Sequence, residues 1–173
     1  TTLNSSYGSG VIVGDAGFLL NNEMDDFSSK PGHPNLYGLI GGEANSIQPN
    51  KRMLSSMTPS IVEKNGQLFM VVGTPGGSTI ITGVLQTILN VVEYDLSIQD
   101  AVTKARFHYQ WRPDEIKIES NKFDSLVIQK LKQMGHSFKK VKSMNRVDAI
   151  LIKEDGSIEA GADPRGDDAF SGF

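Results

Sequence analysis

The chain has 173 residues, of which 38% are hydrophobic and 21% charged, with a formal net charge of -3 and no cysteine. This length suits a single domain with a buried core, so we expect one domain over residues 1–173. The slightly acidic balance argues against nucleic acid as a partner. Without cysteine, neither a disulfide framework nor a thiolate zinc site can form. No stretch approaches the roughly 18 apolar residues of a membrane span.

Short apolar runs alternate with glycine near the start of the chain. Residues 10–14 (GVIVG) and 17–22 (GFLLNN) predict short strands of a packed sheet. Residues 28–50 then contain three prolines and four glycines without periodicity. We expect a long irregular loop there, and loops of that length inside a compact domain are usually functional or disordered.

Clear strand and helix signals follow this loop. Asn65-Gly66 joins two apolar runs and predicts a hairpin, because both residues tolerate positive φ. Helical spacing predicts a buried helix from Thr79 to Val92, a second one after the N-cap Ser97, and a third over 124–134. Further strands are expected over 115–119, 137–141, 147–153 and 157–161. Strands, helices and strands again indicate an α+β fold.

The segment VVGTPGGSTII runs from a strand through Gly76 and Gly77 into a helix. Consecutive backbone N–H groups at such a turn suit an anion or a developing oxyanion. A tight strand-to-helix turn without any ligand explains the same residues. A phosphate-binding P-loop is disfavoured, because Ser78 stands where its lysine should follow the glycines.

Two further clusters carry polar chemistry. Ser55 and Ser56 lie on a loop, where hydroxyls can donate to a carboxylate but more often stabilise turns. Glu23, Asp25 and Asp26 place three carboxylates just after an apolar run, where they suit an ammonium group or simply face solvent.

The three histidines are His33, His108 and His136, and no pair of them has metal-ligand spacing. Each is more typical of a structural than of a catalytic histidine. We therefore expect neither a metal nor a cofactor.

Several motifs occur together in a consistent order: TLNSSYGSG, GFLLNNEMDDFSSKPG, NLYGLIGG, NKRMLSSMTP, GTPGGSTIITGVLQ, ARFHYQW and DPR. In this order they resemble the small subunit of γ-glutamyltranspeptidase over nearly the whole chain. The resemblance implies an N-terminal-nucleophile hydrolase with a four-layer αββα sandwich. It also implies a precursor that cuts itself into a large and a small subunit, with the large subunit as partner.

The family's activity, implied here by resemblance, moves the γ-glutamyl group of glutathione and related amides through a threonine glutamyl ester. The acceptor is water, an amino acid or a peptide. The resemblance further implies a bacterial protein that is periplasmic or secreted.

Residue roles are also carried over from the family motifs. Ser55 and Ser56 match the serines that bind the α-carboxylate of the glutamyl group, and Gly76 and Gly77 match the oxyanion-hole glycines. The residues that match the holders of the α-amine are Asn4, Glu23 and Asp26. Glutamine can occupy the Glu23 position in the family. Tyr37 matches the tyrosine of a lid, which we expect over residues 28–45.

The sequence begins with two threonines, and the position of its TLN motif relative to the family's motif bears on whether one of them is the nucleophile. The TLN motif that binds substrate begins here at Thr2, whereas in the family a strand and a turn precede it. The resemblance therefore implies that the nucleophilic threonine lies upstream of this chain, which lacks that first strand and turn. Thr2 matches the threonine whose hydroxyl supports the nucleophile.

Two other functions stay open at this point. An acylase for other amides, such as a cephalosporin side chain or poly-γ-glutamate, would use the same machinery, because family resemblance fixes machinery better than substrate. A catalytically silent binding subunit is the alternative from another class.

Overall fold

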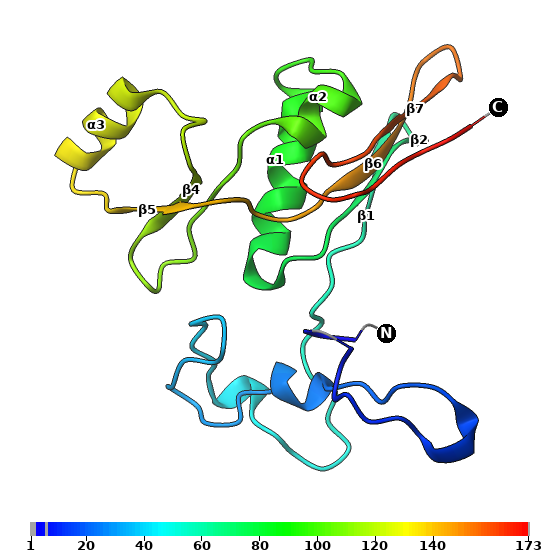
Figure 1. The fold of residues 1–173 in the computed structure, drawn as a ribbon, viewed down its shortest axis with the longest axis vertical. Helices are drawn as coiled ribbons and strands as arrows, with labels where there is room; N and C mark the ends of the chain where they lie inside the picture. The colour runs from blue at the N-terminus through cyan, green and yellow to red at the C-terminus, as the bar shows by residue number, and fades with distance from the viewer. Residues whose placement is uncertain (1–2, 6, 173) are drawn as a thin grey trace. The chain divides into compact units, whose positions relative to one another are not determined.

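The structure, a computed structural model, describes residues 3–5 and 7–172. The chain divides into two compact units, residues 1–57 and 58–173 (Figure 1). The expectation of a single domain over residues 1–173 stays a prediction.

The start of the smaller unit is an exposed ribbon rather than part of a sheet. Ile12 and Leu19 form one isolated antiparallel bridge, on either side of a 3-10 turn at Gly14–Ala16. The predicted packed strands over 10–14 and 17–22 were therefore wrong. Ile12 and Phe18 are 62% and 56% exposed, because the described residues of this unit provide no layer that covers them.

The rest of the smaller unit consists of turns and loops. It contains the 3-10 turns Glu23–Asp26 and Glu43–Asn45, and isolated bridges join Ser28 to Ser46 and Pro34 to Ile40. The expected irregular loop over 28–50 is confirmed, since its described residues form no α-helix and no strand beyond isolated bridges.

The larger unit is built on an antiparallel sheet with the strand order β1-β2-β6-β7. The predicted hairpin is confirmed, with φ values of 55° at Asn65 and 75° at Gly66 in the turn between the first two strands. The four strands are β1 (Ser60–Lys64), β2 (Gln67–Gly73), β6 (Asp148–Ile152) and β7 (Ile158–Gly161).

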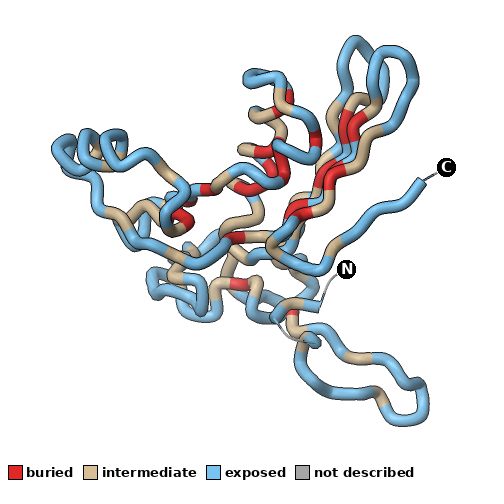
Figure 2. Tube along the Cα trace, turned by 45° about the horizontal axis from the view of Figure 1, so that its top comes forward, coloured by how far each residue is buried: buried red, intermediate tan, exposed pale blue. Residues whose placement is uncertain are grey.

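Two helices pack on one face of this sheet and confirm the periodicity of the sequence: α1 (Ile80–Val92) and α2 (Ile98–Thr103). Ser97 caps α2, because its Oγ accepts the Asp100 N–H at 3.1 Å. Among the helices of the described residues, none has the length and apolar character needed to cross a membrane. The core between helices and sheet is red in Figure 2 and includes Met70, Val72, Val84, Ile98, Val102, Ala149 and Leu151.

The opposite face of the sheet is apolar and bare. Ile61, Val71 and Ile150 are paired across three neighbouring strands and are 71%, 37% and 44% exposed. A four-layer sandwich buries such a face under a second sheet. The α+β class is therefore confirmed, and the larger unit supplies one helical layer and one sheet layer of the expected architecture.

A second, three-stranded sheet has the order β3-β4-β5 and consists of β3 (Phe107–His108), β4 (Ile116–Glu119) and β5 (Phe138–Val141). Its last two strands are parallel and are connected through α3 (Ser125–Gln133). The helix expected over 124–134 is confirmed. Asp124 caps it, because its Oδ1 accepts the Leu126 N–H at 2.7 Å, and Gly135 follows its end with a φ of 97°. The two-residue β3 was not predicted, because it is too short to show alternation.

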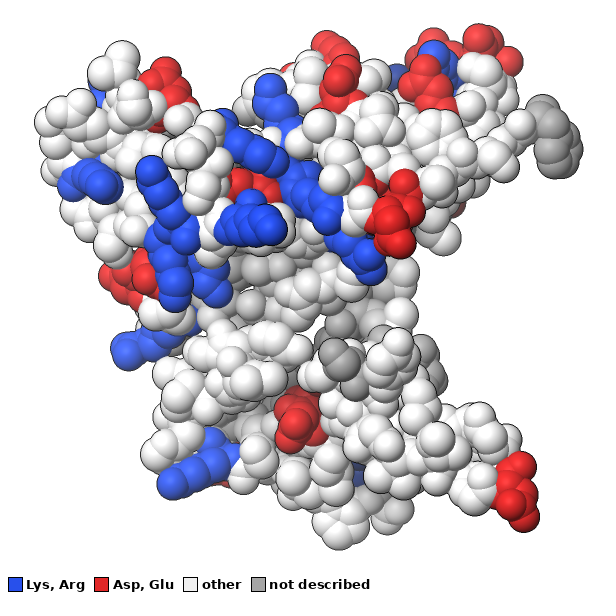
Figure 3. Space-filling view, viewed as in Figure 1, with Lys and Arg blue, Asp and Glu red and all other residues white. Residues whose placement is uncertain are grey.

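Lysine and arginine side chains gather on the face of the larger unit that Figure 3 shows, with acidic side chains beside them. Lys122 Nζ lies 3.6 Å from Glu119 Oε2, and Arg146 Nη1 lies 3.6 Å from Asp167 Oδ1. This mixture of signs agrees with the small net charge of the chain.

Four charged residues form a buried ion network in the larger unit. Arg106 Nη1 lies 2.7 Å from Asp163 Oδ2, and Arg165 Nη1 lies 3.0 Å from Asp163 Oδ1. Arg165 also donates two hydrogen bonds to Glu119, from Nε at 2.5 Å and from Nη2 at 2.6 Å. The side chains of the two carboxylates are 0% exposed. Each buried charge is therefore paired, as burial requires.

These pairings decide the protonation of the two acids. Burial alone would raise the pKa of Glu119, but hydrogen bonds from Arg165 and from backbone amides hold it below its ordinary 4.5. Burial likewise opposes ionisation of Asp163, but backbone amides and Arg106 hold its pKa below 3.8. Both carboxyl groups therefore stay ionised at neutral pH.

We expect Glu119→Gln to lower the free energy of unfolding by about 3–5 kcal/mol, because it leaves two buried guanidinium groups with a single buried carboxylate, Asp163, as their counter-charge. Glu154→Gln is the matched control. Its ion pair with Lys64 is exposed, with side chains 93% and 57% accessible, and should change stability by less than about 0.5 kcal/mol.

The free energy of unfolding, measured against pH, shows in which direction ionisation of Glu119 and Asp163 changes stability. An acid with a lowered folded-state pKa stabilises the fold above its unfolded pKa and loses that contribution as pH falls through the folded value. The contribution of the network should therefore be complete above the ordinary pKa values of 4.5 for Glu119 and 3.8 for Asp163. It should decline as pH falls below these values towards the lower folded-state pKa values of the two groups. Urea denaturation of the complete protein measures both effects. Equal loss in the two variants would contradict the role of the network.

Candidate functional site

Residues from distant parts of the smaller unit's sequence meet around the 3-10 turn Glu23–Asp26. Asn4 Nδ2 donates to both carboxylate oxygens of Asp26, at 3.1 and 3.3 Å. The backbone N–H of Asn4 donates to Asn22 Oδ1 at 3.0 Å, which fixes Asn4 beside the turn. The structure thus brings together Asn4 and Asp26, as the family motifs imply.

Glu23 is buried in this cluster, at 9% exposure. Burial raises its pKa, and the neighbouring Asp26 carboxylate raises it further, while the Ser56 hydroxyl acts in the opposite direction. Within the described residues, Glu23 Oε1 and Ser56 Oγ are buried atoms without a hydrogen-bond partner. Unpaired buried polar atoms are costly, and they point to a ligand that pairs with them.

The two adjacent serines have different surroundings. Ser55 is exposed, and its Oγ accepts the Met57 N–H at 3.2 Å within a local turn. Ser56 directs its hydroxyl into the Glu23 cluster. Of the predicted pair, the structure therefore brings Ser56 to the site and places the Ser55 hydroxyl in its own turn.

This arrangement can hold a zwitterion. Two carboxylates and an amide oxygen suit an ammonium group, and a buried hydroxyl suits a carboxylate. An ammonium beside Glu23 would also lower the raised pKa of its carboxyl group, because the opposite charge favours the ionised form.

The loop over 28–45 is folded on itself next to this cluster. Gly32 N–H donates to Gly41 O at 2.8 Å, and Asn35 Oδ1 accepts the backbone N–H groups of Tyr37 and Leu39. Tyr37 lies at the tip of this hairpin-like segment and is 42% exposed.

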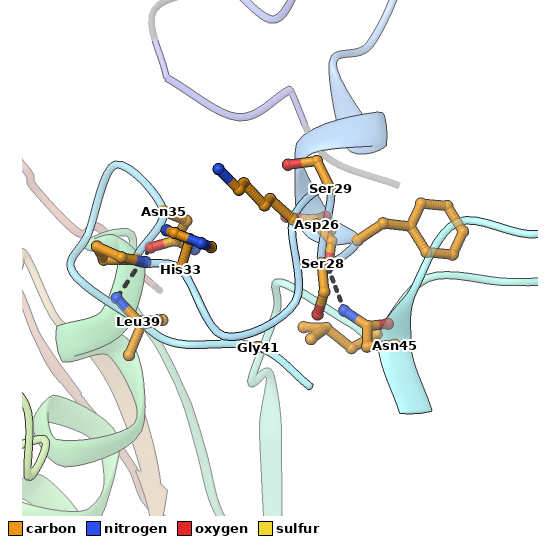
Figure 4. Close-up of a pocket in the computed structure, with 12 residues that line it drawn as sticks. Asp26, Ser28, Ser29, His33, Asn35, Leu39, Gly41 and Asn45 are labelled. Carbon is orange, nitrogen blue, oxygen red and sulfur yellow. Dashed lines mark hydrogen bonds between the residues drawn. The ribbon is translucent and has the colours of Figure 1, made fainter. Parts of the chain in front are cut away.

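A small cavity lies at the base of the loop, with Asp26 and Ser28 on one side and His33, Asn35 and Leu39 on the other (Figure 4). Asn45 Nδ2 donates to Asp26 O at 2.7 Å and so ties the base of the loop to the turn Glu23–Asp26. The loop is therefore anchored at its base and exposed at its tip.

The turn at Gly76 and Gly77 lies in the larger unit, between β2 and α1. Its φ values are 147° and 58°, which favour glycine. Among the described hydrogen bonds, none has the amide N–H of either glycine as its donor. Two unused amides ahead of a helix suit a negatively charged oxygen.

Thr2 lies outside the described residues. His108 is buried between Thr82 Oγ1 and Gln110 Oε1, each 2.8 Å from a ring nitrogen, which suits a structural histidine. Over residues 3–5 and 7–172, no group of three or more acidic or histidine side chains is arranged to hold a metal ion.

Sequence reasoning assigned no role to the residues that support the glycine turn. Thr74, Asn145 and the ion network around Arg106 and Asp163 contact the turn or the loop beside it. The only signal was that Arg106 and Arg165 lie within the quoted motifs ARFHYQW and DPR. Their partners are too far away in sequence for spacing to reveal them.

Three comparisons with known proteins match this chain to the same group of enzymes. The model of the gamma-glutamyltranspeptidase family matches residues 1–173. The glutathione hydrolase proenzyme of Escherichia coli is 46% identical over 99% of this chain and 30% of its own length. A mutant gamma-glutamyltranspeptidase of Helicobacter pylori has a TM-score of 0.90 at 53% identity, with 96% of this chain and 91% of that chain covered.

A gamma-glutamyltranspeptidase of Pseudomonas nitroreducens, in a complex with L-DON, also has a TM-score of 0.90, at 44% identity over 100% of this chain and 91% of that chain. The chain thus spans about 30% of the length of the curated relative and nearly all of the two crystallised chains. A family match over the whole chain and this structural agreement lead to one conclusion: the chain belongs to the gamma-glutamyltranspeptidase family.

Proposed function

We propose that this chain is the small subunit of a γ-glutamyltranspeptidase, which cleaves the γ-glutamyl amide of glutathione and related compounds. The observation that carries the proposal is the cluster of Asn4, Glu23, Asp26 and Ser56. Two buried oxygens of this cluster, Glu23 Oε1 and Ser56 Oγ, have no hydrogen-bond partner within the described residues. The charged amine and carboxylate of a glutamyl group need such charge-assisted partners.

In this proposal Glu23 and Asp26 bind the α-ammonium of the donor, with Asn4 holding Asp26 in place. Ser56 donates to the α-carboxylate, and Ser55 joins it once its hydroxyl leaves the turn with Met57. Fixing the head group at both charges orients the γ-carbonyl for attack, which is a large part of what positioning contributes to catalysis.

The chemistry needs a nucleophile, which we assign to a threonine upstream of this chain, supported by the hydroxyl of Thr2. Its hydroxyl oxygen forms a bond to the γ-carbonyl carbon, and its proton passes to the leaving amine as the C–N bond breaks. The amides of Gly76 and Gly77 donate to the oxyanion formed in between. Water or an amino-acid amine then attacks the glutamyl ester and regenerates the threonine hydroxyl.

The partner in this proposal is the large subunit of the same precursor, and the location is periplasmic or secreted in a bacterium. An amide acylase that acts on a cephalosporin or on poly-γ-glutamate would use the same donors. The test is an assay of the complete processed enzyme with γ-glutamyl-p-nitroanilide, with and without glycylglycine. Release of p-nitroaniline from this substrate supports the proposal. An enzyme that hydrolyses another amide but not γ-glutamyl-p-nitroanilide would overturn it.

The raised pKa of Glu23 predicts the pH dependence of KM. As pH falls, Glu23 becomes protonated at a higher pH than the ordinary 4.5 and loses its attraction for the ammonium, so KM should rise on the acidic side. In Glu23→Gln this rise should disappear, and KM at neutral pH should increase about fivefold, because a neutral acceptor binds an ammonium about 1 kcal/mol more weakly.

Asp25→Asn is the matched control, since Asp25 is exposed in the same turn. Its KM should follow the wild-type profile at every pH. An acidic rise in KM that persists in Glu23→Gln would show that another group titrates.

We also propose that residues 28–45 act as a lid with Tyr37 at its tip. Tyr37→Ala should raise hydrolysis relative to transfer to glycylglycine, because a closed lid excludes water from the glutamyl ester. Tyr94→Ala, at an exposed tyrosine of the larger unit, should leave this ratio unchanged.

A deletion tests whether the tip is separate from the core of the unit. Removing residues 34–40 spares Gly41, whose backbone packs against Ser28, so the unfolding temperature should stay the same. Unfolding of the deletion variant, or an unchanged ratio in Tyr37→Ala, would contradict the lid.

A further inference from the structure

We propose that Thr74 is a positioning residue that sets the direction of the Gly76 and Gly77 amides. The inference rests on the proposed function, in which these amides stabilise an oxyanion. Thr74 itself does not touch the substrate in this proposal.

Thr74 lies directly after β2, and its hydroxyl cross-links the chain to Arg146. The backbone N–H of Arg146 donates to Thr74 Oγ1 at 3.1 Å, and Thr74 Oγ1 lies 2.8 Å from Arg146 O. Pro75 O is also 2.8 Å from this hydroxyl. Since the hydroxyl has one proton, it donates to one carbonyl at a time while it accepts from Arg146.

The partner of this cross-link is itself fixed by the buried ion network. Met144 N–H donates to Glu119 Oε1 at 3.2 Å, and Met144 O accepts from Arg106 Nη1 at 2.9 Å. On the other side of Arg146, the Val147 N–H donates to Asp163 Oδ2 at 2.7 Å. The loop over 144–147 is therefore a rigid support for the start of the turn.

Asn145 provides a second contact between the same loop and the turn. Its Nδ2 donates to Pro75 O at 3.1 Å. A Cβ atom on Gly76 would lie 2.3 Å from this nitrogen, and one on Gly83 would lie 2.9 Å from the Asn145 side chain. The carboxamide thus fills the space between the turn and the first part of α1.

A glycine pair has many backbone conformations, so its amides point in a fixed direction only when both ends of the turn are held. The helix holds the Gly77 end, and the Thr74 hydroxyl with its Arg146 partner holds the other. Preorganised donors stabilise an oxyanion because they need no rearrangement during the reaction. Loss of the hydroxyl should therefore reduce turnover rather than substrate binding.

The test compares Thr74→Val with Thr74→Ser in the complete processed enzyme. Valine keeps the shape of threonine without its hydrogen bonds, and serine keeps the hydroxyl. We expect Thr74→Val to lower kcat for γ-glutamyl-p-nitroanilide about tenfold, with KM within about twofold, because small misplacements of catalytic donors are costly. Thr74→Ser should restore kcat to within about twofold of wild type.

Thr103→Val is the matched control, since Thr103 is exposed in the same unit and accepts one hydrogen bond from Gln99 at 3.1 Å. Its kcat should not change. Thermal unfolding of all variants separates positioning from stability, and we expect Thr74→Val to retain its kcat deficit at temperatures where it is fully folded.

Two outcomes would overturn the inference. One is a wild-type kcat in Thr74→Val, and the other is a loss that Thr74→Ser does not restore. Both require an active wild-type enzyme. An inactive wild-type enzyme would instead contradict the proposed function, so the two failures are distinguishable.

Discussion

The larger unit depends on the buried network of Arg106, Glu119, Asp163 and Arg165. Two guanidinium groups and two carboxylates pair with almost no exposure to solvent, and their remaining hydrogen bonds go to backbone atoms of the surrounding loops. Such a network adds little net stability compared with an apolar core, but removal of one member leaves a buried charge. Its main effect is therefore to fix where the surrounding backbone lies.

That effect extends to the proposed chemistry. The network holds the loop over 144–147, the loop holds Thr74, and Thr74 begins the turn that carries Gly76 and Gly77. In the proposed function the smaller unit has a different role, which is to bind a charged head group through Glu23, Asp26 and Ser56. Its cluster keeps buried oxygens unpaired, whereas the larger unit pairs every charge of its network. This contrast is typical of the difference between a binding site and a structural support.

Local signals in the sequence predicted most elements of the larger unit. Asn65-Gly66 indicated the hairpin through its φ preferences, Ser97 indicated the start of α2 through its capping side chain, and helical spacing indicated α3. The packed strands predicted from the apolar runs over 10–14 and 17–22 were wrong, because apolar residues form a stable sheet only where another layer covers them. The ion network could not be predicted, since Arg106 and Asp163 are 57 positions apart and meet only in the folded chain. The head-group residues came from family motifs, because hydroxyls and carboxylates on loops have many ordinary uses.

The most direct test of the central claim is a crystal structure of the complete enzyme with bound glutamate. The account predicts the α-ammonium within about 3 Å of Glu23 and Asp26 and the α-carboxylate on Ser56, as charge-assisted hydrogen bonds require. It also predicts a γ-carboxylate oxygen about 2.7–3.1 Å from the amide nitrogens of Gly76 and Gly77. Glutamate bound with its α-carboxylate away from Ser56, or with its γ-carboxylate away from the glycine turn, would contradict the account.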